Sequence, residues 1–150
     1  MSPNQYRLEP MAIEDFDEVS RLWQNTEGVG LNESDSKPNI ASFLVRNPGM
    51  SFVARQRDEI IGAVLCGHDG RRGYLHHLAV AREHRNRGIG KKLLAACFSE
   101  LAAAGILKCS IFVFHHNSDG ESFWQQHGWT KRNDLRLLQK AIIAAPKTRP

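Results

Sequence analysis

One short stretch, residues 76–94, constrains the fold more than any other part of the sequence. It joins an apolar, β-rich run ending at Val80 to a helix-like segment that begins at Gly88. The loop between them places Arg85, Gly88 and Gly90 in the spacing RxxGxG. A strand, a basic glycine loop and a helix in direct succession predict an anion site, because free N–H groups and a positive dipole end lie at a helix N-terminus.

The glycines and the basic residues of this loop suit phosphate oxygens for separate reasons. Gly88 and Gly90 have no side chain to block close approach. Arg85, Arg87 and Lys91 can add charge-assisted hydrogen bonds. The sequence matches neither the GxxxxGK[ST] loop of nucleoside triphosphatases nor the GxGxxG loop of dinucleotide sites. We therefore expect a phosphate or a pyrophosphate held by a loop of another type.

The chain is expected to form one α/β domain over residues 1–145, with 146–150 as a flexible tail. Hairpins come first and a β-α-β unit follows, which favours a mixed, mostly antiparallel sheet with helices on both faces. The expected helices cover residues 14–25, a short segment after Pro38, 88–104 and 118–127. The expected strands cover residues 6–8, 51–55, 60–66, 73–80, 109–114, a run from Trp129, and 135–138.

Composition argues against two classes of protein. No run of about 18 apolar residues is present, so no membrane span is expected. The N-terminus lacks the pattern of a signal peptide, and a cytoplasmic location is the expectation. A formal net charge of +4 would permit nucleic-acid binding. The basic residues gather on one loop, however, without a recognition helix or a stacking motif, so no nucleic-acid partner is expected.

Cysteine and histidine patterns argue against thiol and metal chemistry. The three cysteines lie in apolar segments without CxxC spacing and are expected to be small buried residues; Cys109 is the one near the expected site. Two histidine pairs, His76-His77 and His115-His116, are adjacent in sequence. Neighbouring residues on a strand point to opposite faces, so each pair offers at most one ligand to a given site. We expect no metal.

Two motifs together resemble the GCN5-related N-acetyltransferase (GNAT) family. The first is 77-HLAV-80 followed by 85-RNRGIG-90, and the second is 117-NSDGESFWQQHGW-129, a partial match to the family's N-x-x-A-x-x-F-Y-x-x-x-G-[FWY]. The order of elements matches over nearly the whole chain. The resemblance implies a GNAT-like sheet with splayed central strands. It also implies transfer of an acetyl group from acetyl-CoA to a primary amine of a small molecule or peptide, by direct attack in a ternary complex, and leaves a homodimer open.

The resemblance also assigns cofactor-binding residues. It implies that the N–H groups of the first motif bind the coenzyme A pyrophosphate, through Arg85, Asn86, Arg87, Gly88, Ile89, Gly90 and Lys91. The strand before this loop, with Leu78, Ala79 and Val80, would pair with the pantetheine arm like an added strand. Asn117 stands where the family contacts the cofactor, and Trp124 stands near the sulfur. A helix cap for Asn117 and plain packing for Trp124 are the alternatives.

The catalytic residues depart from the family pattern. The family often has a Glu on the strand before the loop and a Tyr in the second motif, whereas this chain has Tyr74 and Trp124 at these places. Indole cannot serve as a practical acid. Strict strand alternation places Tyr74, His76, Leu78 and Val80 on one face and Leu75, His77 and Ala79 on the other. His76 is the predicted base, and Tyr74 or water could supply the proton for the departing thiolate.

An acidic early loop carries the predicted acceptor contacts. Glu27 and Glu33, with Asp35 nearby, would suit a cationic amine, and a solvated loop is the alternative. The main competing function is a non-catalytic acyl-CoA-binding or sensing domain, since Trp124 replaces the expected acid. Thiol release from acetyl-CoA in the presence of amines separates the two functions.

Overall fold

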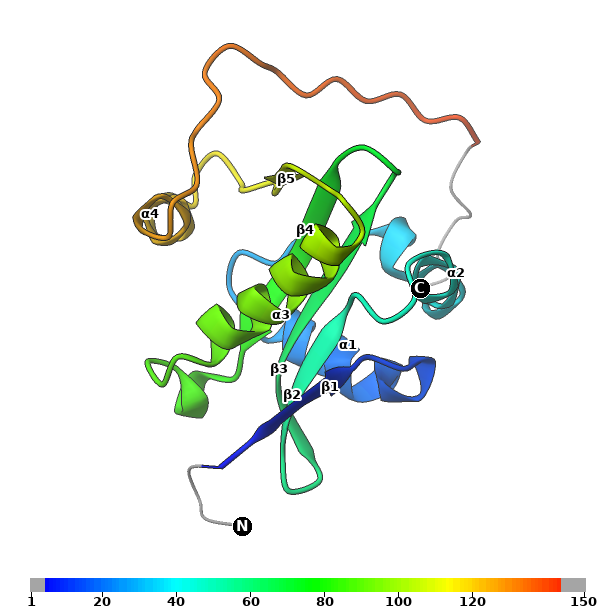
Figure 1. Ribbon diagram of the computed structural model, residues 1–150, viewed down its shortest axis with the longest axis vertical. Helices are drawn as coiled ribbons and strands as arrows, with labels where there is room; N and C mark the ends of the chain where they lie inside the picture. The colour runs from blue at the N-terminus through cyan, green and yellow to red at the C-terminus, as the bar shows by residue number, and fades with distance from the viewer. Residues whose placement is uncertain (1–4, 144–150) are drawn as a thin grey trace, which may run out of the picture. The chain divides into compact units, whose positions relative to one another are not determined.

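The computed structural model describes residues 5–143 (Figure 1). The chain divides into two compact units, Met1–Phe112 and Val113–Pro150. Labels η denote short 3-10 helices. The elements of the first unit are β1 (Arg7–Pro10), η1 (Ile13–Asp15), α1 (Phe16–Gln24), η2 (Glu33–Asp35), α2 (Lys37–Arg46), β2 (Phe52–Gln56), β3 (Glu59–His68), β4 (Gly73–Val80), η3 (Arg82–His84), α3 (Ile89–Ala103) and β5 (Cys109–Ser110). The second unit contains α4 (Ser118–Gln126).

Five strands form one sheet in the order β1-β2-β3-β4-β5. The first four strands pair antiparallel, and β5 pairs parallel to β4. This last pairing is confined to Gly73 opposite Cys109 and Tyr74 opposite Ser110. In the described part of the chain, the edge of β4 from Leu75 to Val80 therefore has no strand beside it. The predicted mixed, mostly antiparallel sheet is confirmed, and β4 and its neighbour β5 part after two residue pairs.

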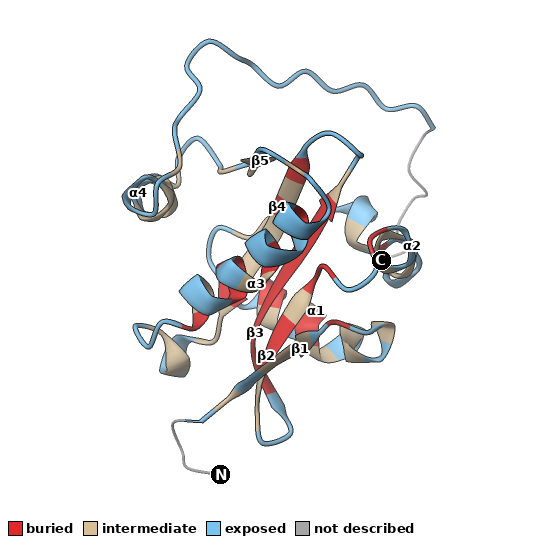
Figure 2. Ribbon diagram, viewed as in Figure 1, coloured by how far each residue is buried: buried red, intermediate tan, exposed pale blue. Residues whose placement is uncertain are grey.

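Helices cover both faces of this sheet, with α3 on one face and α1 and α2 on the other (Figure 1). Buried residues concentrate on β3 and on the strands beside it (Figure 2). On the α1 face, Val19 and Trp23 stand four residues apart and both are about 1% exposed, which is the spacing of one helix face. The buried residues of α3 are Ile89, Leu93, Leu94, Cys97 and Leu101.

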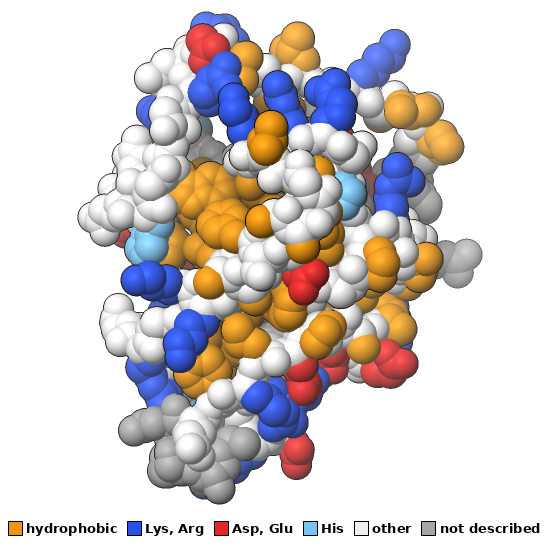
Figure 3. Space-filling model, in the orientation of Figure 1, with side chains coloured by type: hydrophobic (Ala, Val, Ile, Leu, Met, Phe, Trp, Pro, Cys, Tyr) orange, Lys and Arg blue, Asp and Glu red, His pale blue; other side chains and the backbone are white. Residues whose placement is uncertain are grey.

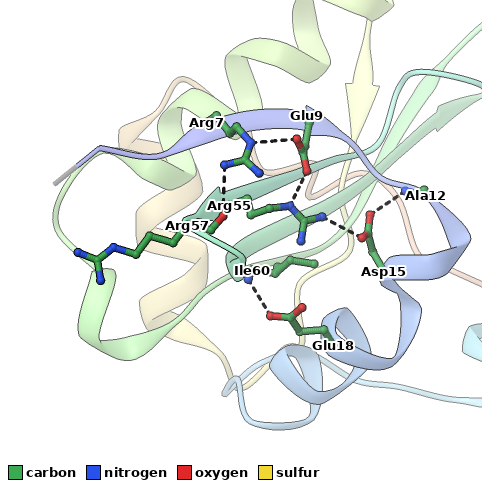
Figure 4. Close-up of polar contacts among 8 residues, drawn as sticks. All are labelled: Arg7, Glu9, Ala12, Asp15, Glu18, Arg55, Arg57 and Ile60. Atoms are coloured by element: carbon green, nitrogen blue, oxygen red, sulfur yellow. Dashed lines mark hydrogen bonds and ion pairs between the residues drawn. The ribbon is translucent and has the colours of Figure 1, made fainter. Parts of the chain in front are cut away.

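An ion-pair cluster joins β1, β2 and η1 (Figure 4). The Arg55 guanidinium donates from Nε to Glu9 and from Nη2 to Asp15, the latter over 2.9 Å. Asp15 also accepts from the backbone N–H of Ala12. The side chains of Arg55 and Asp15 are only 16% and 15% exposed. The hydrogen bond from Arg55 is the main reason that the pKa of Glu9 lies below its ordinary value. We refer to Arg55, Glu9 and Asp15 as the Arg55 cluster.

Some sequence predictions about the strands are wrong. The strand expected over residues 109–114 is reduced to Cys109–Ser110. The strands expected from Trp129 and over residues 135–138 are absent from the described part of the second unit. Leu135 and Leu138 are 58% and 90% exposed. Their alternation would specify a strand only beside a neighbour able to complete its hydrogen bonds, and within this unit none of the described segments does so.

Two further expectations concern the chain as a whole. The predicted tail, residues 146–150, lies outside the described residues. Across residues 5–143, no helix has both the length and the apolar character that crossing a bilayer requires.

Candidate active site

The N-terminus of α3 has the properties of an anion site. The first intrahelical hydrogen bond of this 15-residue helix runs from the N–H of Lys92 to the carbonyl of Gly88. The N–H groups of Ile89, Gly90 and Lys91 precede it and point out of the helix end. No side chain in the described part of the chain caps this end. The helix dipole adds to the attraction for an anion at this point.

The backbone before α3 leaves room for a ligand. Asn86 and Gly88 have left-handed φ values of 63° and 79°, a conformation found in loops that curve successive N–H groups around an anion. A Cβ added at Gly88 would meet no atom within 4 Å. A Cβ at Gly90 would lie 3.8 Å from Val80 Cγ2 and 3.9 Å from Leu78 Cδ2. The helix start therefore borders the free edge of β4.

The backbone of Val80 faces this free edge. The N–H of the next residue, Ala81, donates to the carbonyl of Ile61 in β3 over 2.8 Å. Successive strand residues direct their backbone groups to opposite neighbours, so Val80 directs its groups away from β3. Its carbonyl accepts from Arg85 Nε over 2.9 Å. From Tyr74 to Val80 the edge is on the order of 20 Å long, at about 3.3 Å per residue.

The residues present fit coenzyme A. A helix N-terminus that can take a pyrophosphate borders an unpaired strand edge that can take an extended, amide-containing arm. Arg85 links the two parts, because its side chain belongs to the loop and contacts the last residue of β4. We call the loop from Arg82 to Lys91 the cofactor loop.

Glu27 lies against the cofactor loop. Its carboxylate pairs with Arg82 and, over 3.3 Å, with Nη1 of Arg85. Hydrogen bonds from Arg82 and then Arg85 hold the pKa of Glu27 below its ordinary value. The Glu27 side chain is 63% exposed. A cavity of about 370 Å³ opens beside this cluster and is lined by Leu22, Asn25, Thr26, Ala81, Arg82, Glu83 and Arg85.

A β-bulge interrupts β4 at His77. His76 pairs with Leu65 and Ala79 pairs with Ala63, so two residues of β4 stand opposite Val64 alone. His77 has a left-handed φ of 57°, which is uncommon for a residue other than glycine, although histidine tolerates it better than most. The extra residue reverses the facing of every residue that follows it.

The alternation predicted from the sequence is therefore wrong beyond His76. His76 and Ala79, which the prediction placed on opposite faces, share the α1 face with Leu65 and Ala63. Val80 pairs with Gly62, whose missing side chain would point at Leu93 and Ile89 of α3. His76 and Val80 consequently lie on different faces, although both were expected on one.

Aromatic rings surround His76 near the end of the free edge at which β5 begins to pair with β4. Its ring centroid lies 6.1 to 6.4 Å from those of Phe43, Tyr74 and Phe112. Burial, and then the nearby charge of His77, lower the pKa of His76. None of the described residues hydrogen-bonds to its ring. Phe112 is 60% exposed, one of several hydrophobic side chains that reach the surface, as Figure 3 shows for one face of the molecule.

His77 has a carboxylate partner that the sequence did not reveal. Its Nε2 lies 2.9 Å from Asp35 Oδ1, and its ring meets the buried Trp23 ring edge-on at 5.1 Å. The side chains of His77 and Asp35 are 17% and 11% exposed. Burial alone would raise the pKa of Asp35, but hydrogen bonds from His77 and from the backbone of Asn32 outweigh it, and the pKa is lowered.

The other predicted site residues lie as follows. Glu33 is exposed in η2, and its backbone carbonyl accepts from the Asn39 side chain. In the second unit, Asn117 caps α4 by accepting the N–H of Gly120 over 3.0 Å. Trp124 packs edge-on against Trp129, with ring centroids 5.1 Å apart. These contacts show the capping and the packing, and the cofactor roles of Asn117 and Trp124 stay predictions.

Cys109 does not resemble a reactive thiol. Burial, and then the neighbouring Cys66, raise the pKa of Cys109 to about 12. A nucleophilic cysteine needs a lowered pKa, because the thiolate is the reactive form.

Comparison with known proteins agrees with this geometry. The model of the acetyltransferase (GNAT) family matches residues 16–129. An acetyltransferase of Photorhabdus laumondii is 33% identical over 104 residues, which are 69% of this chain and 72% of that protein. An acetyltransferase of Sodalis glossinidius is 28% identical over 130 residues, 87% of this chain and 91% of that protein.

Solved structures share the fold. The PaiA N-acetyltransferase of Thermoplasma acidophilum, solved with coenzyme A, superposes with a TM-score of 0.73 at 22% identity, covering 84% of this chain and 90% of that one. An aminoglycoside acetyltransferase from a soil metagenome, solved with sisomicin, has a TM-score of 0.70 at 18% identity, covering 93% and 98%.

The fold and the site define an acetyl-CoA-dependent acetyltransferase. The chain belongs to the acetyltransferase (GNAT) family. The predictions of the family, of N-acetyltransferase activity and of acetyl-CoA as the acetyl donor are confirmed, and the non-catalytic alternative is not favoured.

Proposed function

We propose that the cofactor loop and the free edge of β4 hold acetyl-CoA, and that a cationic primary amine of a small molecule or peptide receives the acetyl group. The observation that carries this proposal is the contiguity of the α3 N-terminus with the β4 edge at Gly90, Val80 and Leu78. Acetyl-CoA would supply an acetyl group activated as a thioester. The protein would supply position, orientation and a route for protons.

Each part of the cofactor loop has a proposed task. The N–H groups from Gly88 to Lys91 bind pyrophosphate oxygens, while Arg85 and Arg87 add charge. Arg85 also holds the end of β4 in place through the Val80 carbonyl. The backbone groups of Leu78 and Val80 align the arm as an added strand would, with Ala79 between them.

The direction of the arm locates the reacting end. The pyrophosphate lies by Gly90, so the arm runs along β4 toward Tyr74, where β5 begins to pair and closes the edge. The reacting end would lie near His76, Tyr74 and Phe112. Tyr74 as the proton donor to the departing thiolate, and one of the two adjacent histidines, His76 or His77, as the base, are proposals supported by this position.

The acceptor is proposed to enter beside the segment between α1 and α2, residues 25–36. Family members act on small-molecule or peptide amines, and the exposed carboxylate of Glu33 on this segment would attract a cation. Glu27 would join it where phosphates of the cofactor take its place at Arg85. We also propose a cytoplasmic location and no nucleic-acid partner.

Calorimetry with coenzyme A, followed by thiol release from acetyl-CoA, tests the proposal. The amine panel comprises spermidine, sisomicin, a peptide with a free N-terminus and an N-terminally blocked lysine peptide. We expect binding of coenzyme A and amine-dependent thiol release with at least one of them. No coenzyme A binding by the wild-type protein would overturn the proposal.

Two matched glycine variants place the site. Gly88 and Gly70 both have left-handed φ values and open space at Cβ, but Gly70 lies in the β3–β4 turn. Gly88→Glu should abolish measurable coenzyme A binding, because a carboxylate replaces the anion. Gly70→Glu carries the same charge and the same backbone strain, and should bind as the wild type does. Equal affinities in the two variants would show that the cofactor loop is not the site.

A further inference from the structure

We propose that His77, oriented by Asp35, accepts the proton of the acceptor ammonium. This inference rests on the proposed function, since it concerns the same reacting end of the β4 edge. The sequence pointed to His76 for this task. The bulge and the contact with Asp35 are what single out the neighbouring histidine.

His77 lies where an acceptor amine must lose its proton. It directly follows His76, at the proposed reacting end of the free edge, and the two rings lie 6.2 Å apart. Its partner Asp35 belongs to the segment between α1 and α2, which is the proposed acceptor side. The pair therefore joins the strand that would carry the acetyl donor to the segment that would meet the acceptor.

The contact with Asp35 fixes which nitrogen of His77 holds the proton. Asp35 accepts the N–H of Asn32 at one oxygen and faces His77 Nε2 with the other. An ionised carboxylate can only accept hydrogen bonds, so Nε2 must be the donor. In neutral His77 the lone pair is then on Nδ1, which is free to take a proton. An orienting carboxylate of this kind serves the histidine of hydrolase triads in the same way.

His76, the neighbouring histidine, has different surroundings. His76 is enclosed by Phe43, Tyr74 and Phe112, and none of the described carboxylates pairs with its ring. No carboxylate of the described residues hydrogen-bonds to His76, whereas Nε2 of His77 lies 2.9 Å from Asp35 Oδ1. The titratable groups facing His77 are Asp35 from η2 and His76 from β4; from α1 it meets the uncharged Trp23.

The proton balance of the step is as follows. The ammonium gives one proton to Nδ1 of His77, and the freed nitrogen lone pair forms the new bond to the thioester carbon. The carbon–sulfur bond breaks and its electron pair leaves with the sulfur. The nitrogen loses its second proton to that sulfur, directly or through water. His77 then returns its proton to solvent, so the amide, the free thiol and one proton are the products.

Nuclear magnetic resonance of the free protein tests the tautomer without any substrate. With ¹⁵N-labelled histidine at a pH where His77 is neutral, we expect the Nε2–H form in the wild type. In Asp35→Asn, the amide can act as donor or acceptor, and a mixture of tautomers is expected. An Nδ1–H form in the wild type, or the same tautomer ratio in both proteins, would overturn the inference.

Rate profiles against pH then test the proton transfer. With acetyl-CoA and the fastest amine of the panel, His77→Asn should lower kcat on the order of 100-fold, the usual contribution of a general base, and should remove the acidic limb of kcat/KM. Asn is chosen because it tolerates left-handed φ. Asp35→Asn should lower kcat by less, about tenfold, because Asp35 only orients the histidine. His76→Gln is the matched control and should keep the acidic limb.

The outcomes separate this inference from the proposed function. Coenzyme A binding within twofold of wild type shows that the variants retain the cofactor loop. An acidic limb that persists in His77→Asn, or that is lost only in His76→Gln, would assign the proton to His76 or another group and overturn the inference. Failure of the wild type to bind coenzyme A would instead overturn the proposed function, whatever the tautomer of His77.

Discussion

Two arginine–carboxylate clusters of the first unit have the same chemistry in different surroundings. The Arg55 cluster joins β1, β2 and η1; Arg55 and Asp15 are largely shielded from solvent, and Glu9 is 34% exposed. In the Glu27 cluster, the carboxylate meets Arg82 and Arg85 at the surface, where Arg82 is 77% exposed. A shielded pair is costly to break because each charge needs its partner, whereas an exposed pair can exchange partners with water or with an anion.

This difference suggests that the two clusters have separate tasks. The Arg55 cluster is expected to serve stability, because it joins three elements and holds Arg55 and Asp15 away from most solvent. The Glu27 cluster occupies an arginine of the cofactor loop with a carboxylate that an incoming phosphate could displace. Four predictions, in order of decreasing effect, test whether the two clusters differ in this way.

The largest effect is expected for Arg55→Ala. Removing the guanidinium leaves Asp15 without a cationic partner and leaves Glu9 with the more exposed Arg7 alone, which should lower the free energy of unfolding by about 2 kcal/mol. Urea denaturation measures the loss. Arg82→Ala, the matched change in the exposed cluster, should leave the urea midpoint unchanged. Equal losses in the two variants would remove the proposed distinction.

Arg85→Ala should affect cofactor binding and leave stability nearly unchanged, the reverse of what is expected for Arg55→Ala. Stability should change little, but affinity for coenzyme A should fall about tenfold, as expected for one charge-assisted hydrogen bond. Calorimetry provides the measurement, and Arg55→Ala at a temperature where it is folded provides the control with unchanged affinity. An Arg85→Ala variant with wild-type affinity would mean that this arginine serves β4 alone.

Acid should affect the Arg55 cluster next. The pKa of Glu9 in the folded protein is lowered from 4.5, so its contribution to stability is present above that value and is lost as the pH falls through the lowered pKa. Urea midpoints measured downward from pH 6 should decline more steeply for the wild type than for Arg55→Ala. Parallel curves would show that the Arg55 pair contributes nothing to acid sensitivity.

The smallest effect is expected for Glu27→Gln. If Glu27 competes with the phosphates for Arg85, the neutral variant should bind coenzyme A about two- to fourfold more tightly at low salt, in the range of exposed ion pairs. The gain should shrink as salt screens the charges. Calorimetry at two ionic strengths decides, and weaker binding by the variant would assign Glu27 a supporting role instead.

The sequence predicted the fold where local patterns and pairing partners agree. The strand over residues 73–80 matches β4, and the predicted helix over 88–104 differs from α3 by one residue at each end. Glycine marks both ends of that helix, at Gly88 and Gly105, and its apolar face is regular. The predicted final strands lacked any such support from a neighbour, and alternation alone did not specify them.

The site was predictable in its cofactor part and not in its catalytic part. The cofactor loop is contiguous in sequence, so RxxGxG carries its own signal. The Asp35–His77 contact joins residues 42 positions apart. It also depends on the bulge at His77, which follows from how β3 and β4 pair. The acidic residues of the early loop were visible in the sequence, but their partners, Arg82 and Arg85 for Glu27 and His77 for Asp35, were not.

The bulge also divides β4 into two stretches in which odd-numbered and even-numbered residues face opposite sides of the sheet. Before it, odd-numbered residues such as Gly73 and Leu75 face α3; after it, the even-numbered Val80 does. Deleting one of the two residues opposite Val64 would leave Ala79 opposite Ala63 and Val80 opposite Gly62, so both stretches of β4 would keep the faces that they have. The left-handed residue at His77 would be lost, and with it the backbone that brings its ring to Asp35. The extra residue of this strand is therefore a feature that the candidate site uses and that the core does not require.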